Sequence, residues 1–246
     1  MSHAYNAEFM SYADQSSRHA ANTIARLIKT ELSISSVLDV GCAKGTWLNA
    51  WRESGSEDIL GLDGDYVRRE ELVIPEHHFS ARDLSQPLDL GRRFDLVQSL
   101  EVAEHLPHSV ADLFVDNLVR HSAGYILFSA APPGQGGEFH INEQPYDYWR
   151  EKFARHGFRA YDWIRPQIQA MTSISFWYRY NLFLYAHESA IVPASIASAA
   201  VPSGTPLSDI SPRAFRLRKA VVRMLPVQVR DGLARFKSRY LPSGRW

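Results

Sequence analysis

Residues 36–45 read Ser36-Val-Leu-Asp-Val-Gly-Cys-Ala-Lys-Gly45. The first five form a short, mostly apolar run, which is typical of a strand buried on both faces of a sheet. Two glycines stand among the next five residues, and residues 46–52 then carry Trp47, Leu48 and Trp51 at helical spacing. A strand, a glycine-containing turn and a helix in this order predict the opening of a strand–helix–strand unit.

The alternation of strands and helices continues along the chain. A helix is expected first, over residues 14–32, where apolar residues recur every three or four positions. Strands that alternate with helices predict an α/β fold, a Rossmann-like, doubly wound, mostly parallel sheet of seven strands. The last two strands have no helix between them, which predicts an antiparallel edge strand. After the sheet, the chain is expected to end in a helical tail. Further strands are expected at 59–63, 78–81, 94–99, 125–130, 158–164 and 175–186, and further helices at 66–72, 109–120 and 145–157.

Charge is distributed unevenly along the chain. The formal net charge is zero, yet residues 211–246 hold ten basic residues and one acid, Asp231. Residues 189–213 are rich in Ala, Ser, Pro and Val and show no period. We therefore expect one domain over residues 1–188, a linker at 189–213 that lacks regular structure, and a basic amphipathic helical tail at 214–246.

Composition excludes several classes of protein. Cys42 is the single cysteine, so neither an intrachain disulfide nor a zinc–cysteine cluster can form, and no metal site is predicted. No apolar run reaches the roughly 18 residues of a spanning helix. Residues 1–10 lack the layout of a secretory signal, which predicts a cytoplasmic protein. The acidic body also lacks the basic patch of a nucleic-acid-binding surface.

The basic tail has two interpretations. An amphipathic segment with many basic residues predicts peripheral contact with an anionic membrane surface, with the acidic body held off. Folding of the tail back onto the acidic body is the alternative.

An acid precedes the glycine turn in the pattern Asp39-x-Gly41-x-Ala43-x-Gly45. The glycine spacing of a dinucleotide fingerprint is not met, because Ala43 and Thr46 stand where it needs glycines; this opposes a nicotinamide dehydrogenase. The pattern resembles instead the first motif of class I S-adenosylmethionine-dependent methyltransferases, whose middle residue is usually glycine. We expect the methyl group of Ala43 to cost little unless that residue needs a positive φ.

Three further positions agree with that family. Asp63 ends the second strand, where an acid can accept both ribose hydroxyls, and a helix cap is the alternative for Asp63 and Asp83. The family uses an acid at the position of Asp83 to bond the adenine amino group, with the N–H of Leu84 meeting the ring. The stretch Ser99-Leu-Glu-Val-Ala-Glu-His105 resembles the family's Glu-x-x-Glu-His stretch after the fourth strand. The resemblance implies S-adenosylmethionine as cofactor, bound by Asp39, Gly41, Cys42, Ala43, Gly45, Asp63, Gly64, Asp83, Leu84, Ser99, Leu100 and Glu101.

Two histidines follow strands at the edge where the methyl acceptor must lie. His105 follows the fourth strand, and His140 lies in the irregular stretch 131–144 after the fifth. Histidine suits a general base near neutral pH, so both are candidate catalytic residues, with His140 preferred as base or acceptor anchor. Residues 133–142 with 146–149 resemble one subgroup of bacterial small-molecule and sugar methyltransferases, which implies a small acceptor such as a sugar or glycan hydroxyl.

A non-catalytic module is the alternative function. It would keep the fold and the cofactor and act as a scaffold or a membrane-tethered partner. Intact acids at Asp39, Asp63 and Asp83 favour cofactor binding under either interpretation. The sequence leaves the acceptor, the methylated atom and the oligomeric state open.

Overall fold

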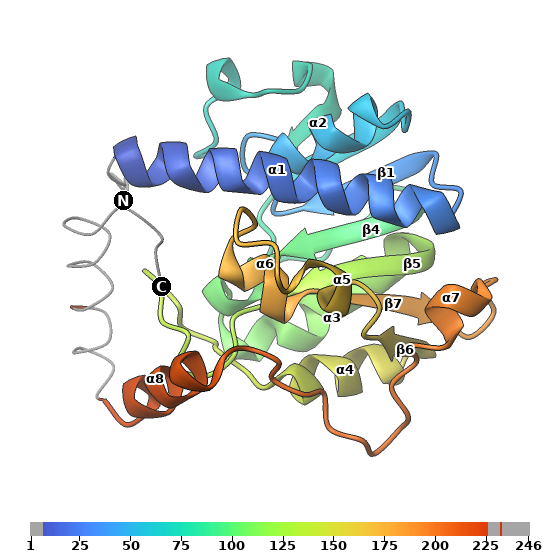
Figure 1. Cartoon of the computed structure of the whole chain (residues 1–246). Helices are drawn as coiled ribbons and strands as arrows, with labels where there is room; N and C mark the ends of the chain where they lie inside the picture. The colour runs from blue at the N-terminus through green and yellow to red at the C-terminus, as the bar shows by residue number, and fades with distance from the viewer. Residues whose placement is uncertain (1–6, 226–231, 233–246) are drawn as a thin grey trace.

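One seven-stranded sheet organises the molecule. The computed structural model of the 246-residue chain describes residues 7–225 and residue 232. The strand order is β3-β2-β1-β4-β5-β7-β6 (Figure 1). β7 is antiparallel to both of its neighbours, and the other pairs are parallel. The predicted sheet, mostly parallel with antiparallel pairing toward one edge, is confirmed. The strands are β1 (Ser36–Val40), β2 (Asp58–Asp63), β3 (Phe79–Ala81), β4 (Phe94–Leu100), β5 (Ser122–Ser129), β6 (Phe158–Tyr161) and β7 (Phe183–His187).

Helices cover both faces of this sheet (Figure 1). α1, α2, α5, α6 and α7 contribute to one apolar cluster, and α3 and α4 contribute to a second. The helix expected at 66–72 is reduced to a 3-10 turn at Arg69–Glu71. The helices are α1 (Ala7–Glu31), α2 (Thr46–Glu53), α3 (Ala111–His121), α4 (Tyr146–Ala154), α5 (Arg165–Ile168), α6 (Phe176–Asn181), α7 (Ala194–Ala197) and α8 (Arg213–Arg223).

The direction in which strands are added reverses between β1 and β4. The chain first builds outward from β1 to β2 and β3, and then returns to place β4 and β5 on the other side of β1. In open α/β sheets, ligands bind beyond the carboxyl ends of the strands at such a reversal. A ligand is therefore expected beside the connections that follow β1, β2 and β4.

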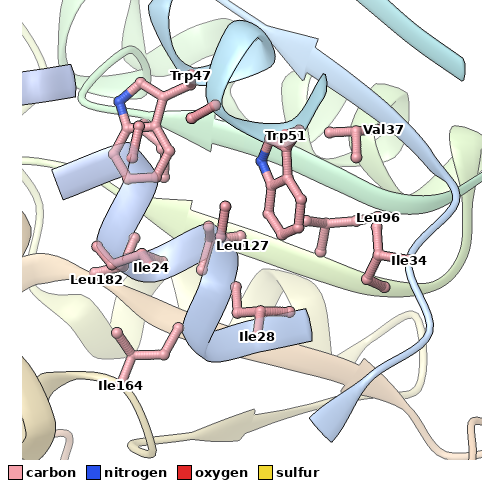
Figure 2. Packing of buried hydrophobic residues seen from close by; sticks show 14 of the residues in the cluster. Ile24, Ile28, Ile34, Val37, Trp47, Trp51, Leu96, Leu127, Ile164 and Leu182 are labelled. Carbon is pink, nitrogen blue, oxygen red and sulfur yellow. The ribbon is translucent and has the colours of Figure 1, made fainter. Parts of the chain in front are cut away.

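Two tryptophans of α2 hold the turn after β1 in place. Trp47 and Trp51 lie in the larger apolar cluster with Ile24 and Ile28 of α1 (Figure 2). Trp51 is fully buried, and its indole Nε1 donates a hydrogen bond to Oε1 of Gln98 in β4 at 2.8 Å. A buried indole N–H needs an acceptor, so this bond fixes α2 against the centre of the sheet.

The strand expected over residues 175–186 is wrong in its first half. Residues 176–181 form α6, and only the remainder contributes to β7. Aromatic residues favour strands, but helical spacing places Phe176 and Tyr180 on one face, where both rings contact Phe215 of α8. Tertiary packing overrides the local preference here.

Residues 189–213, expected as a linker without regular structure, pack onto the domain instead. They contain α7 and bury Ile196 completely. The backbone N–H of Val201 donates to the carbonyl of Ala160 in β6 at 3.0 Å. β6 is the last strand of the sheet, so this segment supplies hydrogen-bond partners to an edge that would otherwise be open.

The described part of the basic tail folds back onto the domain. α8 packs against the loop after β5 so closely that a Cβ added at Gly134 would lie 2.1 Å from the carbonyl oxygen of Lys219. Lys219 is 5% exposed, and its ammonium group lies 2.6 Å from the Asp209 carboxylate. The rest of the predicted tail, from residue 226 onward, lies outside the described residues except for Gly232. Among the described helices, none has both the length and the apolar character needed to cross a membrane.

Candidate active site

The turn between β1 and α2 presents backbone at the carboxyl edge of the sheet. Gly41, Ala43 and Gly45 all have a positive φ, at 92°, 47° and 84°. A Cβ added at Gly41 would lie 2.3 Å from Cγ2 of Val102, which follows β4. The turn therefore contacts the connection after β4 at a point where only glycine fits. The N–H groups of Gly41 and Cys42 donate to the carbonyl of Leu62, so hydrogen bonds within the protein fix the backbone of the turn.

Asp63 ties this turn to the end of β2. Its carboxylate accepts hydrogen bonds from the backbone N–H groups of Ala43 and Gly64, both at 2.7 Å, and from the hydroxyl of Tyr66. Asp63 is 4% exposed, whereas Tyr66 is 76% exposed. Because the Tyr66 side chain lies at the surface, a ligand hydroxyl can replace it on the carboxylate.

Asp39 is a second buried acid close to Asp63. Its side chain is buried, and Gln98 of β4 is its partner in the strand register. Burial raises the pKa of Asp39 to about 7; the Gln98 amide acts in the opposite direction, and the Asp63 carboxylate adds to the rise. Two of the predicted cofactor residues therefore form an acidic pair that favours a positively charged ligand.

The other predicted cofactor residues are of two kinds. Asp83 lies in the exposed turn after β3 and accepts hydrogen bonds from the N–H and the hydroxyl of Ser85 at 2.9 and 2.6 Å. These bonds lower the pKa of Asp83. Cys42, Leu84 and Leu100 are buried. Burial also raises the pKa of the Cys42 thiol, which disfavours a nucleophilic thiolate.

The end of β4 connects the turn after β1 to the loop after β5. The Ser99 hydroxyl donates to the carbonyl of Val40 at 2.8 Å, which joins the ends of β4 and β1. Glu101 accepts hydrogen bonds from the side-chain amides of Asn181 at 3.1 Å and Gln135 at 3.0 Å. Glu101, predicted at the cofactor, therefore lies with α6 and with the loop after β5.

His105 and His140 come from separate connections and lie next to each other. Their ring centroids are 4.8 Å apart, with an interplanar angle of 88°. Nδ1 of His140 is 3.0 Å from Oε1 of Glu143, whose carboxylate also accepts the backbone N–H groups of Gly134 and Gly136 at 2.8 and 2.7 Å. Glu143 thus shapes the loop around His140, and a proton held on Nδ1 leaves the Nε2 lone pair available.

Glu104 is a buried acid whose role the sequence did not indicate. It is fully buried, and its backbone carbonyl accepts the N–H groups of Ile141 and Asn142, each at 3.0 Å. Burial raises the pKa of Glu104 well above its ordinary value, and the neighbouring Glu101 carboxylate raises it further. Burial also raises the pKa of Glu101, against the opposing effect of the Asn181 amide. Two buried carboxylates so close together disfavour charge on both.

Four residues of the site were missed by the sequence analysis. Glu104 stands within the Glu-x-x-Glu-His stretch, and Glu143 follows His140 by three residues, so spacing was the available signal for both. Asn181 and Gln135 carry no sequence signal, because only folding brings them to the site.

A family model described as a methyltransferase domain matches residues 12–174. The match covers more than half of the chain. The protein belongs to this methyltransferase family. Its cofactor is S-adenosylmethionine, as the acidic pair and the glycine turn indicated.

Solved methyltransferase structures share the fold. CalS10, an amino pentose methyltransferase from Micromonospora echinaspora solved with S-adenosylmethionine bound, is 16% identical with a TM-score of 0.54, and the match covers 76% of this chain and 99% of that one. KedS8, a sugar N-methyltransferase from a Streptoalloteichus species, is 15% identical with a TM-score of 0.54, with 76% and 95% covered. The magnesium protoporphyrin IX methyltransferase of Synechocystis, with S-adenosylmethionine bound, is 16% identical with a TM-score of 0.51, with 76% and 86% covered. A search of curated proteins finds no match.

Replacement of Ala43 by glycine is expected to stabilise the methyltransferase. The φ of 47° at Ala43 is strained for an L-residue, by about 1 kcal/mol or slightly more, and glycine is free of this strain. Glycine also gains entropy in the unfolded chain, so we expect a net rise of about 0.5 kcal/mol in the free energy of unfolding. Urea denaturation of the variant and the wild type measures this difference in the free energy of unfolding. Ala220→Gly, at an exposed position inside α8, is the control and should lose up to about 1 kcal/mol. A fall in stability for Ala43→Gly would contradict the strain.

Asp39→Asn is expected to change how the stability of the methyltransferase depends on pH. Folding raises the pKa of Asp39 from 3.8 to about 7. Between these values the folded state keeps a proton that the unfolded state has lost, so the wild type loses stability as pH rises through this window, by at most about 1.4 kcal/mol per pH unit from this group. Asparagine does not titrate. In urea denaturation without cofactor, the advantage of Asp39→Asn over the wild type should therefore grow from pH 5 to pH 7 and level off above; a constant difference from pH 5 to pH 8 refutes the raised pKa.

Proposed function

We propose that this methyltransferase transfers the methyl group of S-adenosylmethionine to a hydroxyl of a small acceptor of the sugar or glycan class. The observation that carries the proposal is the His140–Glu143 pair beside His105, at the end of the sheet where ligands bind. Histidine oriented by a carboxylate is a means of removing a proton from an acceptor hydroxyl.

The cofactor half of the site suits the charge of S-adenosylmethionine. This cofactor carries a sulfonium cation and an ammonium group and has no phosphate, so acids at Asp39 and Asp63 favour its binding. We propose that the ribose hydroxyls take the place of Tyr66 on the Asp63 carboxylate. Asp83, after the neighbouring strand, is proposed to accept the adenine amino group, with the Gly41–Gly45 turn against the methionine portion.

Methyl transfer is an in-line displacement, in which the enzyme mainly aligns the reactants. The acceptor oxygen forms a bond to the methyl carbon while the carbon–sulfur bond breaks. Sulfur keeps the electron pair, which gives S-adenosylhomocysteine. The hydroxyl proton passes to Nε2 of His140, and Glu143 stabilises the resulting imidazolium. An amine acceptor needs only to be neutral, so the presence of this pair favours a hydroxyl acceptor.

Two observations support the class of the acceptor. The loop that carries His140 resembles that of bacterial sugar and small-molecule methyltransferases. Two similar folds, CalS10 and KedS8, are named as an amino pentose methyltransferase and a sugar N-methyltransferase. Amino sugars are therefore the acceptors to compare with sugars that offer only hydroxyls.

Peripheral membrane contact of the basic tail stays a prediction. Its support is one surface of α8, on which the apolar residues Leu217, Val221 and Met224 are 68%, 47% and 78% exposed. The basic residues Arg216 and Arg223 are exposed on the same helix. An apolar stripe flanked by arginines suits the interface of an anionic bilayer.

Asp63→Ala is expected to weaken cofactor binding. Loss of hydrogen bonds between a carboxylate and the ribose should cost about 1.5–3 kcal/mol of binding free energy. Calorimetric titration with S-adenosylhomocysteine measures this change. Asp65→Ala, at an exposed acid two residues away, is the control and should bind like the wild type. Equal affinity of Asp63→Ala and the wild type would remove Asp63 from the cofactor site.

His140→Ala is expected to lose activity and keep its cofactor. Removal of a general base typically lowers the rate about 10²–10⁴-fold, whereas S-adenosylhomocysteine should bind with unchanged affinity. The measurement is formation of S-adenosylhomocysteine with a panel of sugars, amino sugars and sugar nucleotides. His77→Ala, at an exposed histidine outside the site, should keep the wild-type rate. Full activity of His140→Ala would exclude His140 as base and as acceptor anchor.

A further inference from the structure

Glu104 has an unsatisfied carboxylate in the interior of the protein. Its side chain is fully buried, and within the described part of the chain neither Oε1 nor Oε2 has a hydrogen-bond partner. Buried acids are normally paired or hydrogen-bonded, because loss of hydration strongly disfavours an isolated charge. The neighbouring Glu101 carboxylate accepts hydrogen bonds from Asn181 and Gln135, and as a second acid it disfavours charge on Glu104. A cation bound beside Glu104 would supply the partner that its carboxylate oxygens lack.

Two imidazoles lie within reach of this carboxylate. Glu104, His105 and His140 can each offer one ligand atom, and these atoms all lie within 4.8 Å of one another. Separations of this size surround a single ion after small rotations of the side chains, because metal–nitrogen and metal–oxygen bonds are about 2.0–2.2 Å long. His105 is exposed, so an ion can enter from solvent while Glu104 holds it from the buried side.

The surroundings of the cluster hold its members in place. Glu104 and His105 share the 3-10 turn Ala103–His105, and the loop that carries His140 is fixed to this turn by two backbone hydrogen bonds to the Glu104 carbonyl. Glu143 lies 3.0 Å from Nδ1 of His140 and leaves Nε2 as the ligand atom. A metal-binding histidine characteristically gives its second nitrogen to a carboxylate in this way.

We propose that Glu104, His105 and His140 form a binding site for one divalent transition-metal ion. Two imidazoles and one carboxylate suit ions such as Mn²⁺, Co²⁺ and Zn²⁺ better than Ca²⁺ or Mg²⁺, which prefer oxygen ligands throughout. Sequence analysis predicted no metal site, because that prediction considered cysteine clusters and these ligands come from two distant loops.

The use of the ion rests on the proposed function. Three protein ligands leave coordination positions open, and an acceptor hydroxyl bound at one of them becomes more acidic. His140 then anchors the acceptor through the ion, and the hydroxyl proton leaves to solvent water instead of to Nε2. The methyl group and the electron pair move as in the metal-free reaction.

Metal binding is tested without cofactor or acceptor. The full chain, stripped with a chelator, is titrated with Mn²⁺, and free Mn²⁺ is followed by electron paramagnetic resonance. We expect one bound ion per chain. Glu104→Gln keeps the shape of the side chain and removes its acidic group, so we expect the variant to fold, which circular dichroism verifies. We expect it to bind Mn²⁺ at least about tenfold more weakly than the wild type.

His156→Gln is the matched control. His156 forms an exposed pair with Asp116, at 2.9 Å, which is a histidine–acid pair outside the proposed site. This variant should bind Mn²⁺ like the wild type. If it loses as much affinity as Glu104→Gln, or if Glu104→Gln binds like the wild type, the bound ion belongs to the surface and the proposed site is overturned.

Two further outcomes separate the metal site from the proposed function. Absence of Mn²⁺, Co²⁺ and Zn²⁺ binding at millimolar concentration overturns the site and leaves the methyl-transfer proposal standing, with Glu101 and Glu104 sharing a proton instead. Full methyl transfer by the chelated wild type, together with loss of activity in His140→Gln, overturns the role of the ion at the acceptor and retains His140 as the base. Activity that disappears with chelation and returns with Mn²⁺ supports the proposal.

Discussion

The hydrogen bond from the Ala43 amide to the Asp63 carboxylate joins the turn after β1 to the end of β2, and the cofactor half of the site is arranged around it. The backbone of the turn packs directly against the Val102 side chain, because Gly41 has no side chain that would separate them. The Asp63 carboxylate is buried, but one of its three donors, the Tyr66 hydroxyl, comes from an exposed side chain. A single buried acid therefore shapes the turn, and it is the acid proposed to bind the ribose hydroxyls.

Glu104 has a comparable place in the proposed acceptor half of the site. Its carbonyl holds the loop that carries His140, and its carboxylate and one nitrogen of each histidine lie within 4.8 Å of one another. Behind that loop, α8 contacts Gly134, and Gln135 reaches the Glu101 carboxylate. α8 therefore packs directly against the loop that carries His140, so truncation before α8 would remove this contact.

The residues proposed for the cofactor were easier to group from the sequence than those proposed for the acceptor. Asp39 and Asp63 lie near the ends of β1 and β2, and Gly41 directly follows β1. The alternation of apolar runs predicted these strands, while their order in the sheet came from the structure. The structure brings these three residues together. Asp83 lies further along the same edge of the sheet, and its carboxylate accepts a hydrogen bond from the N–H of Ser85. His105 and His140 were each identifiable as histidines after a strand, but their contact was not.

Local pattern by itself predicted the α/β class, the mostly parallel sheet with antiparallel pairing toward one edge, and the glycine turn with its acids. These features depend on residues close together in the chain, whose spacing reports directly on burial and backbone conformation. Only the tertiary structure decided that residues 176–181 are helical, that residues 189–213 cover the edge of β6, and that Glu104 is buried close to His140. Each of these depends on contacts between segments tens of residues apart, where packing and desolvation outweigh local preference.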